Sequence, residues 1–285
     1  MAKKYFISKN RLFIFIKDIT KLYLMFLLLV YFIQRFLLYY PDQNSPSPEK
    51  LGVNGFQKVV YNTSDNLKLF GWYKTPQKQK NGESMPTIIF FHGNADKAAY
   101  GAVKLYPLVV RGFGLLLVEY RGYSGNEGKP TEDGLIEDAR TALAFLIKQD
   151  CKLNDVIIYG HSLGSGVATA LAAENNTSAL ILESPYSSIL SVAKDKFWFL
   201  PVKLMLKDTY RSDLRIKKVK SPLLIIHGQK DNLISIKEGE RLFELANMPK
   251  EMVKIPNGQH MNLYELDADK IVISWLSKIG MVDKI

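Results

Sequence analysis

Two kinds of hydrophobic pattern alternate along most of the chain. Short runs rich in Ile, Leu and Val are typical of strands buried on both faces of a sheet. They cover residues 87–91, 114–119, 156–159, 179–182, 222–226 and 252–255. Apolar residues at helical spacing fill 132–148, 165–174, 236–245 and 263–278. Residues 56–61 and 67–74 flank a polar turn and predict an antiparallel hairpin. The alternation predicts an α/β fold with a mostly parallel central sheet flanked by helices, and an active site at the C-terminal strand ends.

A different pattern precedes this region. Residues 22–40 are apolar except for Gln34 and Arg35, and as a helix they would be roughly 28 Å long, close to a bilayer core of about 30 Å. We therefore expect a transmembrane anchor, with membrane lipid as a partner. A cleaved signal peptide and an amphipathic surface helix are the alternatives, and residues 39–42 contain no small-residue cleavage site.

The charge distribution supports a membrane anchor and predicts its orientation across the membrane. The net charge is +10, of which residues 1–41 carry +6. A basic arm beside an apolar run suggests anionic lipid headgroups and disfavours a nucleic-acid partner. The positive-inside rule places the N-terminus in the cytoplasm and the bulk of the chain on the non-cytoplasmic side. The expected organisation is a basic arm and anchor (1–41), a Pro-rich linker (42–55) and a catalytic domain (56–285).

Composition limits the remaining possibilities. At 285 residues, 47% of them hydrophobic, the chain is a globular protein and not a disordered one. The single cysteine, Cys151, excludes an intramolecular disulfide and a cysteine-based zinc site.

The sequence Gly160-His161-Ser162-Leu163-Gly164 stands between a predicted strand and a predicted helix. A G-x-S-x-G pentapeptide is a weak signal alone, but strand, sharp turn and helix are the context that a nucleophile elbow requires. Ser162 is therefore the predicted nucleophile, and the alternative is a serine in an ordinary turn.

A serine nucleophile needs a base held by a carboxylate, in the chain order Ser, acid, His. Asp231 follows the strand that ends near His227, and His260 follows the last strand. We predict Asp231 as the acid and His260 as the base. A solvated turn aspartate and a surface-loop histidine are the alternatives; His92, His161 and His227 are interpreted as structural.

Two backbone N–H groups suffice to stabilise a tetrahedral oxyanion. We assign them to Leu163, directly after the nucleophile, and to Asn94, in the His92-Gly93-Asn94 loop after the predicted strand 87–91.

A lid-like segment at 189–206 contains Phe197 and Trp198. These aromatic residues either pack on the sheet or form an apolar wall of the acyl site, and Tyr186 has the same two interpretations. No metal-ligand cluster and no dinucleotide fingerprint is present, so we expect neither a metal nor another cofactor.

The ordered motifs resemble the α/β-hydrolase superfamily, and most closely its membrane-anchored "α/β-hydrolase domain-containing" branch. They are His92-Gly93-Asn94, Glu119-Tyr120-Arg121-Gly122-Tyr123-Ser124-Gly125, Gly160-His161-Ser162-Leu163-Gly164, Glu183-Ser184-Pro185-Tyr186, His227-Gly228-Gln229-Lys230-Asp231 and Gly258-Gln259-His260. The resemblance covers roughly residues 50–280. Glu119 and Asp96 depart from the branch pattern, which usually has Asp and Gly there.

The resemblance implies a membrane-anchored serine hydrolase that cleaves ester or thioester acyl groups. A serine aminopeptidase-like hydrolase and a catalytically silent binding protein on the same fold are the alternatives. The sequence specifies neither the exact substrate nor the oligomeric state.

Overall fold

An eight-stranded sheet forms the centre of the molecule in the computed structural model, which describes residues 9–79 and 82–282. The strands are β1 (Gln57–Asn62), β2 (Lys68–Lys74), β3 (Thr87–Phe91), β4 (Gly114–Val118), β5 (Val156–His161), β6 (Ala179–Glu183), β7 (Leu223–Gly228) and β8 (Lys250–Ile255). Their spatial order is β1-β2-β4-β3-β5-β6-β7-β8. Strand β2 is antiparallel to β1 and β4, and the other neighbours are parallel. The predicted hairpin and mostly parallel sheet are confirmed.

Helices cover both faces of the sheet. The α-helices are α1 (Lys9–Leu38), α2 (Ala98–Lys104), α3 (Tyr106–Val109), α4 (Glu132–Lys148), α5 (Leu163–Glu174), α6 (Ile189–Lys196), α7 (Val202–Met205), α8 (Ser212–Arg215), α9 (Ile236–Leu245) and α10 (Ala268–Lys278). Short 3₁₀ turns are η1 (Pro48–Leu51), η2 (Leu153–Asp155), η3 (Ile216–Lys218) and η4 (Tyr264–Leu266). Helices α4, α5 and α9 pack on one face, and α2, α3 and α10 on the other.

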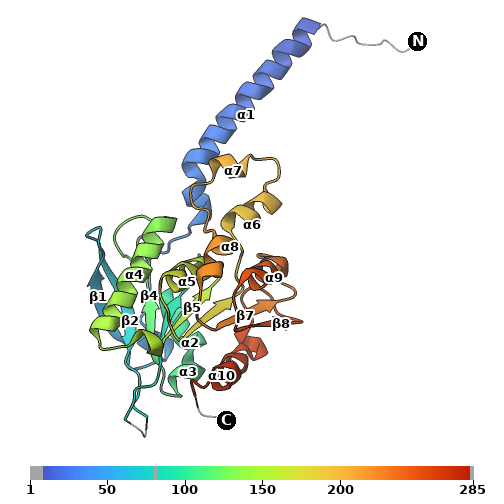
Figure 1. The fold of residues 1–285 in the computed structure, drawn as a ribbon. Helices are drawn as coiled ribbons and strands as arrows, with labels where there is room; N and C mark the ends of the chain where they lie inside the picture. The colour runs from blue at the N-terminus through green and yellow to red at the C-terminus, as the bar shows by residue number, and fades with distance from the viewer. Residues whose placement is uncertain (1–8, 80–81, 283–285) are drawn as a thin grey trace.

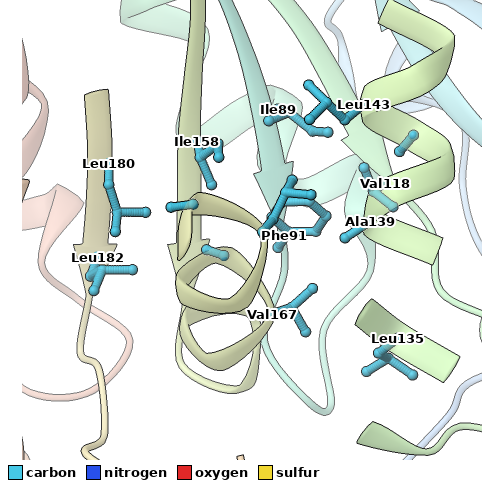
Figure 2. Packing of buried hydrophobic residues seen from close by; sticks show 14 of the residues in the cluster. Ile89, Phe91, Val118, Leu135, Ala139, Leu143, Ile158, Val167, Leu180 and Leu182 are labelled. Atoms are coloured by element: carbon cyan, nitrogen blue, oxygen red, sulfur yellow. The ribbon is translucent and has the colours of Figure 1, made fainter. Parts of the chain in front are cut away.

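Side chains of the central strands point alternately to the two faces of the sheet, so the core consists of two layers. In β3, Ile89 and Phe91 join the layer under α4 and α5, whereas Ile88 and Phe90 join the layer under α2 and α10. Figure 2 shows part of the first layer, where Phe91 lies close to Val118 and Val167. These four β3 side chains are almost completely buried. Burial on both faces explains why these strands are continuous apolar runs.

The N-terminal helix corrects the expectation of a membrane span. Helix α1 projects from the domain (Figure 1), and it carries exposed apolar side chains along both halves of its length. In the described part of the chain, no helix is long and apolar enough to cross a membrane. The predicted span at 22–40, and the topology built on it, are therefore wrong.

The physical reason lies at the C-terminal end of α1, where the polar interruption of the apolar run contacts the domain. Arg35 forms a two-bonded ion pair with Asp208, at 2.8 and 3.1 Å. Tyr39, just after the helix, is buried and its hydroxyl lies 3.0 Å from that of Tyr210. This end of the run thus packs on protein. Residues 1–8 of the basic arm lie outside the described residues.

Candidate active site

Ser162 occupies a sharp turn between β5 and α5. Its backbone has φ 51° and ψ −118°, in the region that residues with a side chain rarely adopt. The turn is possible because its neighbours are small. A Cβ on Gly160 would lie 2.5 Å from the carbonyl oxygen of Gly164, and one on Gly164 would overlap the carbonyl oxygen of Phe91. Close packing of strand against helix thus fixes the position of Ser162.

The structure brings Ser162, His260 and Asp231 into one chain of hydrogen bonds. Nδ1 of His260 lies 2.7 Å from Oδ2 of Asp231, and Nε2 of His260 lies 2.8 Å from Oγ of Ser162. With the ring proton on Nδ1, His260 donates to Asp231 and accepts the hydroxyl proton of Ser162. Each residue is less than a tenth exposed. The alternatives of a solvated aspartate and a surface histidine do not describe these positions.

Asp231 is held as a carboxylate. Its Oδ1 accepts hydrogen bonds from the backbone N–H groups of Leu233 (2.9 Å) and Ile234 (2.8 Å). Burial by itself would raise the pKa of Asp231, but hydrogen bonds from His227, His260 and the Ile234 backbone outweigh it and lower the pKa. The carboxylate therefore remains ionised at neutral pH.

The other three histidines lie around this centre without contacting Ser162 Oγ by a hydrogen bond. His227 is fully buried and donates from Nε2 to the carbonyl of Ile234 at 3.0 Å. His92 lies 2.7 Å from the carbonyl of Gly93 through Nδ1, and packs on Tyr120 at a ring distance of 4.3 Å. These contacts agree with structural roles.

The two residues predicted to form the oxyanion hole are Leu163, next to Ser162 in the chain, and Asn94, in the loop after β3. Leu163 is the first residue of α5, so its N–H is among the helix donors that have no intrahelical partner. The loop after β3 passes directly beside Ser162, because a Cβ on Gly93 would lie 3.5 Å from the Ser162 Cβ. Asn94 follows Gly93 directly in this loop, and its role as an oxyanion donor stays a prediction.

Sequence analysis did not identify a buried polar cluster behind the elbow. Lys104 Nζ donates to both carboxylate oxygens of Glu183 at 2.9 Å, and Tyr159 donates to the same carboxylate at 2.9 Å. His161 Nε2 lies 4.0 Å from Glu183. Burial by itself would raise the pKa of Glu183, but the charges of Lys104 and His161 and the hydrogen bonds from Lys104 and Tyr159 together outweigh it and lower the pKa. Glu183 is the last residue of β6 and pairs with His161 of β5. A carboxylate at the C-terminal end of a buried strand was the sequence feature that could have identified it.

The three possible substrate-binding residues have different positions. Tyr186 is buried and donates to the carbonyl of Leu163 at 3.0 Å, so it braces the elbow. Phe197 lines an apolar cavity of about 600 Å³ between α1 and 189–206. Trp198 is 83% exposed and is not part of that lining. Of the three, only Phe197 is placed to contact a substrate in this cavity.

The opposite wall of this cavity comes from α1, which sequence analysis did not connect with the site. Leu29, Ile33 and Leu37 are among its lining residues. These leucine and isoleucine residues belong to the apolar run at 22–40. A membrane span accounts for the composition of that run equally well, so the sequence did not indicate a cavity wall. As for metals, residues 9–79 and 82–282 contain no group of three or more His, Cys, Asp or Glu side chains that could hold an ion.

Comparisons with known proteins agree with the fold. The Hydrolase_4 family model, described as serine aminopeptidase, S33, matches residues 82–207. Uncharacterized protein Rv2307c of Mycobacterium tuberculosis is 35% identical over 235 residues, which are 82% of this chain and 83% of that protein. The Pyrococcus furiosus esterase Pf2001 superposes with a TM-score of 0.66 and 20% identity, over 84% of this chain and 96% of that one. The α/β hydrolase GrgF from Penicillium superposes with a TM-score of 0.64 and 15% identity, over 79% and 97% of the two chains.

Proposed function

The chain belongs to the α/β-hydrolase superfamily, and from this premise we propose that it is a serine hydrolase that cleaves carboxylic ester or thioester acyl groups. One observation carries the proposal: the continuous hydrogen-bond chain from Asp231 through His260 to Ser162, with distances of 2.7 and 2.8 Å. A serine hydroxyl becomes a competent nucleophile when such a base accepts its proton.

In the proposed reaction, Oγ of Ser162 attacks the substrate carbonyl carbon while its proton passes to Nε2 of His260. The carbonyl oxygen becomes an oxyanion, which the N–H groups of Leu163 and Asn94 stabilise. Asp231 stays ionised and stabilises the imidazolium. The bond to the leaving alcohol or thiol breaks, the leaving group takes the proton from His260, and the acyl group remains on Ser162. Water then attacks the acyl-enzyme with His260 as base, which releases the acid and restores Ser162.

Labelling with a fluorophosphonate probe tests the proposal, because the probe phosphonylates an activated serine. Wild-type protein is expected to react, and Ser162→Ala to lose both labelling and hydrolysis of p-nitrophenyl butanoate. Ser165→Ala is the matched control, since Ser165 is a second buried serine three residues away in α5. Labelling of a folded Ser162→Ala protein at the wild-type level would exclude Ser162 as the nucleophile.

A serine aminopeptidase is the second candidate, because the matching family model carries that description. Such an enzyme needs an acidic group to hold the substrate ammonium. Among the described residues that line the cavity next to Asn94, the charged side chain is Lys196, a cation. This favours an acyl group over an amine. Faster cleavage of leucine p-nitroanilide than of p-nitrophenyl butanoate would favour the aminopeptidase.

A catalytically silent binding protein is the remaining alternative. It would not react with the fluorophosphonate probe in wild-type form, although its fold would be intact. The same labelling experiment therefore separates it from both enzymes.

A further inference from the structure

We propose that α1 forms one wall of the substrate site, and that the cavity between α1 and residues 189–206 holds a long-chain acyl group while its carbonyl is at Ser162. This inference rests on the proposed ester or thioester hydrolase function and names the substrate class. Figure 1 shows α7 beside the lower part of α1 and α6 next to α7. Side chains from all three helices line the cavity.

The composition of the cavity fits a hydrocarbon chain. Its volume of about 600 Å³ is within the usual range of ligand sites. One face of α1 lines it at helical spacing, with Phe26, Leu29, Val30, Ile33 and Leu37. The opposite wall is also apolar and comes from 189–206, with Ile189, Val192, Phe197, Leu200 and Val202. An alkyl chain gains binding free energy from such a surface with each methylene that leaves water.

Two lining residues link the cavity to the proposed catalytic residues Ser162, Asp231 and His260, which are not part of the lining themselves. Asn94, whose backbone is the proposed oxyanion donor, is part of the lining. Leu233 is part of it too, and the Leu233 N–H donates to Asp231 at 2.9 Å. An acyl group attached to Ser162 can therefore extend from the oxyanion loop into the cavity.

The length of the α1 wall indicates the length of the acyl chain. From Leu38, near Asn94, to Phe26 the helix rises roughly 18 Å. A bilayer core of about 30 Å contains two layers of lipid tails, so one tail spans roughly 15 Å. The α1 wall is therefore long enough for the tail of an ordinary fatty acid.

Polar contacts hold the two walls together on both sides of the cavity. Toward the outer end, the Tyr23 hydroxyl donates to the carbonyl of Phe199 at 2.8 Å. Toward the domain, Gln34 donates to the carbonyl of Met205 at 3.1 Å and accepts from the Lys207 N–H at 2.8 Å. These bonds give α1 a fixed position against 189–206.

Two adjacent leucines of α1 provide a matched test. Leu29 lines the cavity, whereas Leu28 does not, and their exposed fractions are similar at 56% and 58%. In the full chain, Leu29→Trp places an indole in the path of the acyl chain, and Leu28→Trp places it outside. We would measure kcat/KM for p-nitrophenyl butanoate, octanoate and dodecanoate below their micellar concentrations.

In wild-type protein, kcat/KM is expected to rise about tenfold or more from butanoate to dodecanoate, since each fully buried methylene contributes a factor of about four and burial of only two of the added methylenes is enough for this rise. Leu29→Trp is expected to remove most of this rise while hydrolysis of butanoate persists. Leu28→Trp is expected to keep it. The inference is overturned if wild-type protein shows no rise, or if both variants change the chain-length preference equally.

A binding measurement separates failure of this inference from failure of the proposed function. Ser162→Ala is titrated with the fluorescent fatty acid 11-(dansylamino)undecanoic acid, alone and combined with each leucine variant. Binding that Leu29→Trp weakens and Leu28→Trp does not would support the acyl cavity even if no ester is cleaved. Absence of binding, together with hydrolysis of butanoate by the wild type, would refute the cavity and leave the hydrolase intact.

Discussion

The side-chain amide of Asn94 donates a hydrogen bond to the backbone carbonyl of Leu38, the last residue of α1. The carbonyl oxygen of the same side chain accepts from the Tyr40 N–H at 3.1 Å and from the Tyr123 hydroxyl at 2.9 Å. Asn94 thus connects the loop beside the nucleophile to the end of the N-terminal helix. The position of α1 and the position of the proposed oxyanion donor are coupled through one side chain.

Asn94→Ala is expected to lower kcat by about tenfold, although the backbone N–H stays in the chain. Loss of an oxyanion donor reduces kcat by about 10² or more, and a displaced donor by less. Tyr123→Phe, which removes one of the three hydrogen bonds, is the control and should have a smaller effect. Steady-state kinetics with p-nitrophenyl butanoate measure both. An unchanged kcat in Asn94→Ala would show that this side chain does not position the loop.

The two histidines near Asp231 are expected to respond differently to substitution. His260→Ala should lower kcat by about 10³-fold or more with a small change in stability, because it removes the proposed base. His227→Ala should chiefly lower the free energy of unfolding, by about 1–3 kcal/mol, because it leaves the buried carbonyl of Ile234 without its donor. Kinetics and urea denaturation of both variants test this. If His227→Ala keeps the wild-type stability but is the less active of the two, the roles are reversed.

Gly164→Ala tests whether the elbow depends on close backbone approach. The added Cβ would overlap the carbonyl oxygen of Phe91, a backbone atom of β3 that cannot move independently. We expect a loss of stability of at least about 2 kcal/mol and a strong loss of fluorophosphonate labelling. Gly52→Ala is a useful comparison, because no atom lies within 4 Å of its Cβ position, so a loss of stability there would come from its positive φ (83°) and not from overlap. Equal melting temperatures of the wild type and Gly164→Ala would contradict the packing argument.

The central sheet and the arrangement of Ser162, Asp231 and His260 were predictable for local reasons. Strands buried on both faces are largely apolar, as residues 88–91 of β3 and 223–226 of β7 are. Parallel strands also place the residues that follow them at one edge, so order along the chain translates into proximity in space. Two helices begin a few residues away from their predicted starts: α5 begins at Leu163 and α10 at Ala268.

The position of α1 against the domain was not predictable, because its contact partners are distant in the sequence. An apolar run of this length has the same composition whether it faces lipid or a protein cavity. The decisive contacts are tertiary: Arg35 with Asp208 and Tyr39 with Tyr210 join residues more than 170 positions apart. The pair of Lys104 and Glu183 was missed for the same reason, since a single charge in each segment gives no sign of its partner.

Stability is expected to fall as the pH decreases from about 6.5 to 4, and His161 is responsible for part of this loss. Burial, together with the charge of Lys104, lowers the pKa of His161 to about 4 in the folded state. The unfolded chain has the ordinary histidine pKa of about 6.5, so between these values it binds more protons than the folded chain does. The difference corresponds to roughly 3 kcal/mol of unfolding free energy, present at pH 7 and lost toward pH 4.

His161→Gln should therefore lose less stability than the wild type between pH 7.0 and 4.5, as measured by urea denaturation at both values. Titrating groups that do not interact with His161 are the same in both proteins and cancel in the comparison, whereas Glu183, 4.0 Å away, contributes to the difference together with His161. Identical losses in the two proteins would mean that His161 titrates alike in the folded and unfolded states.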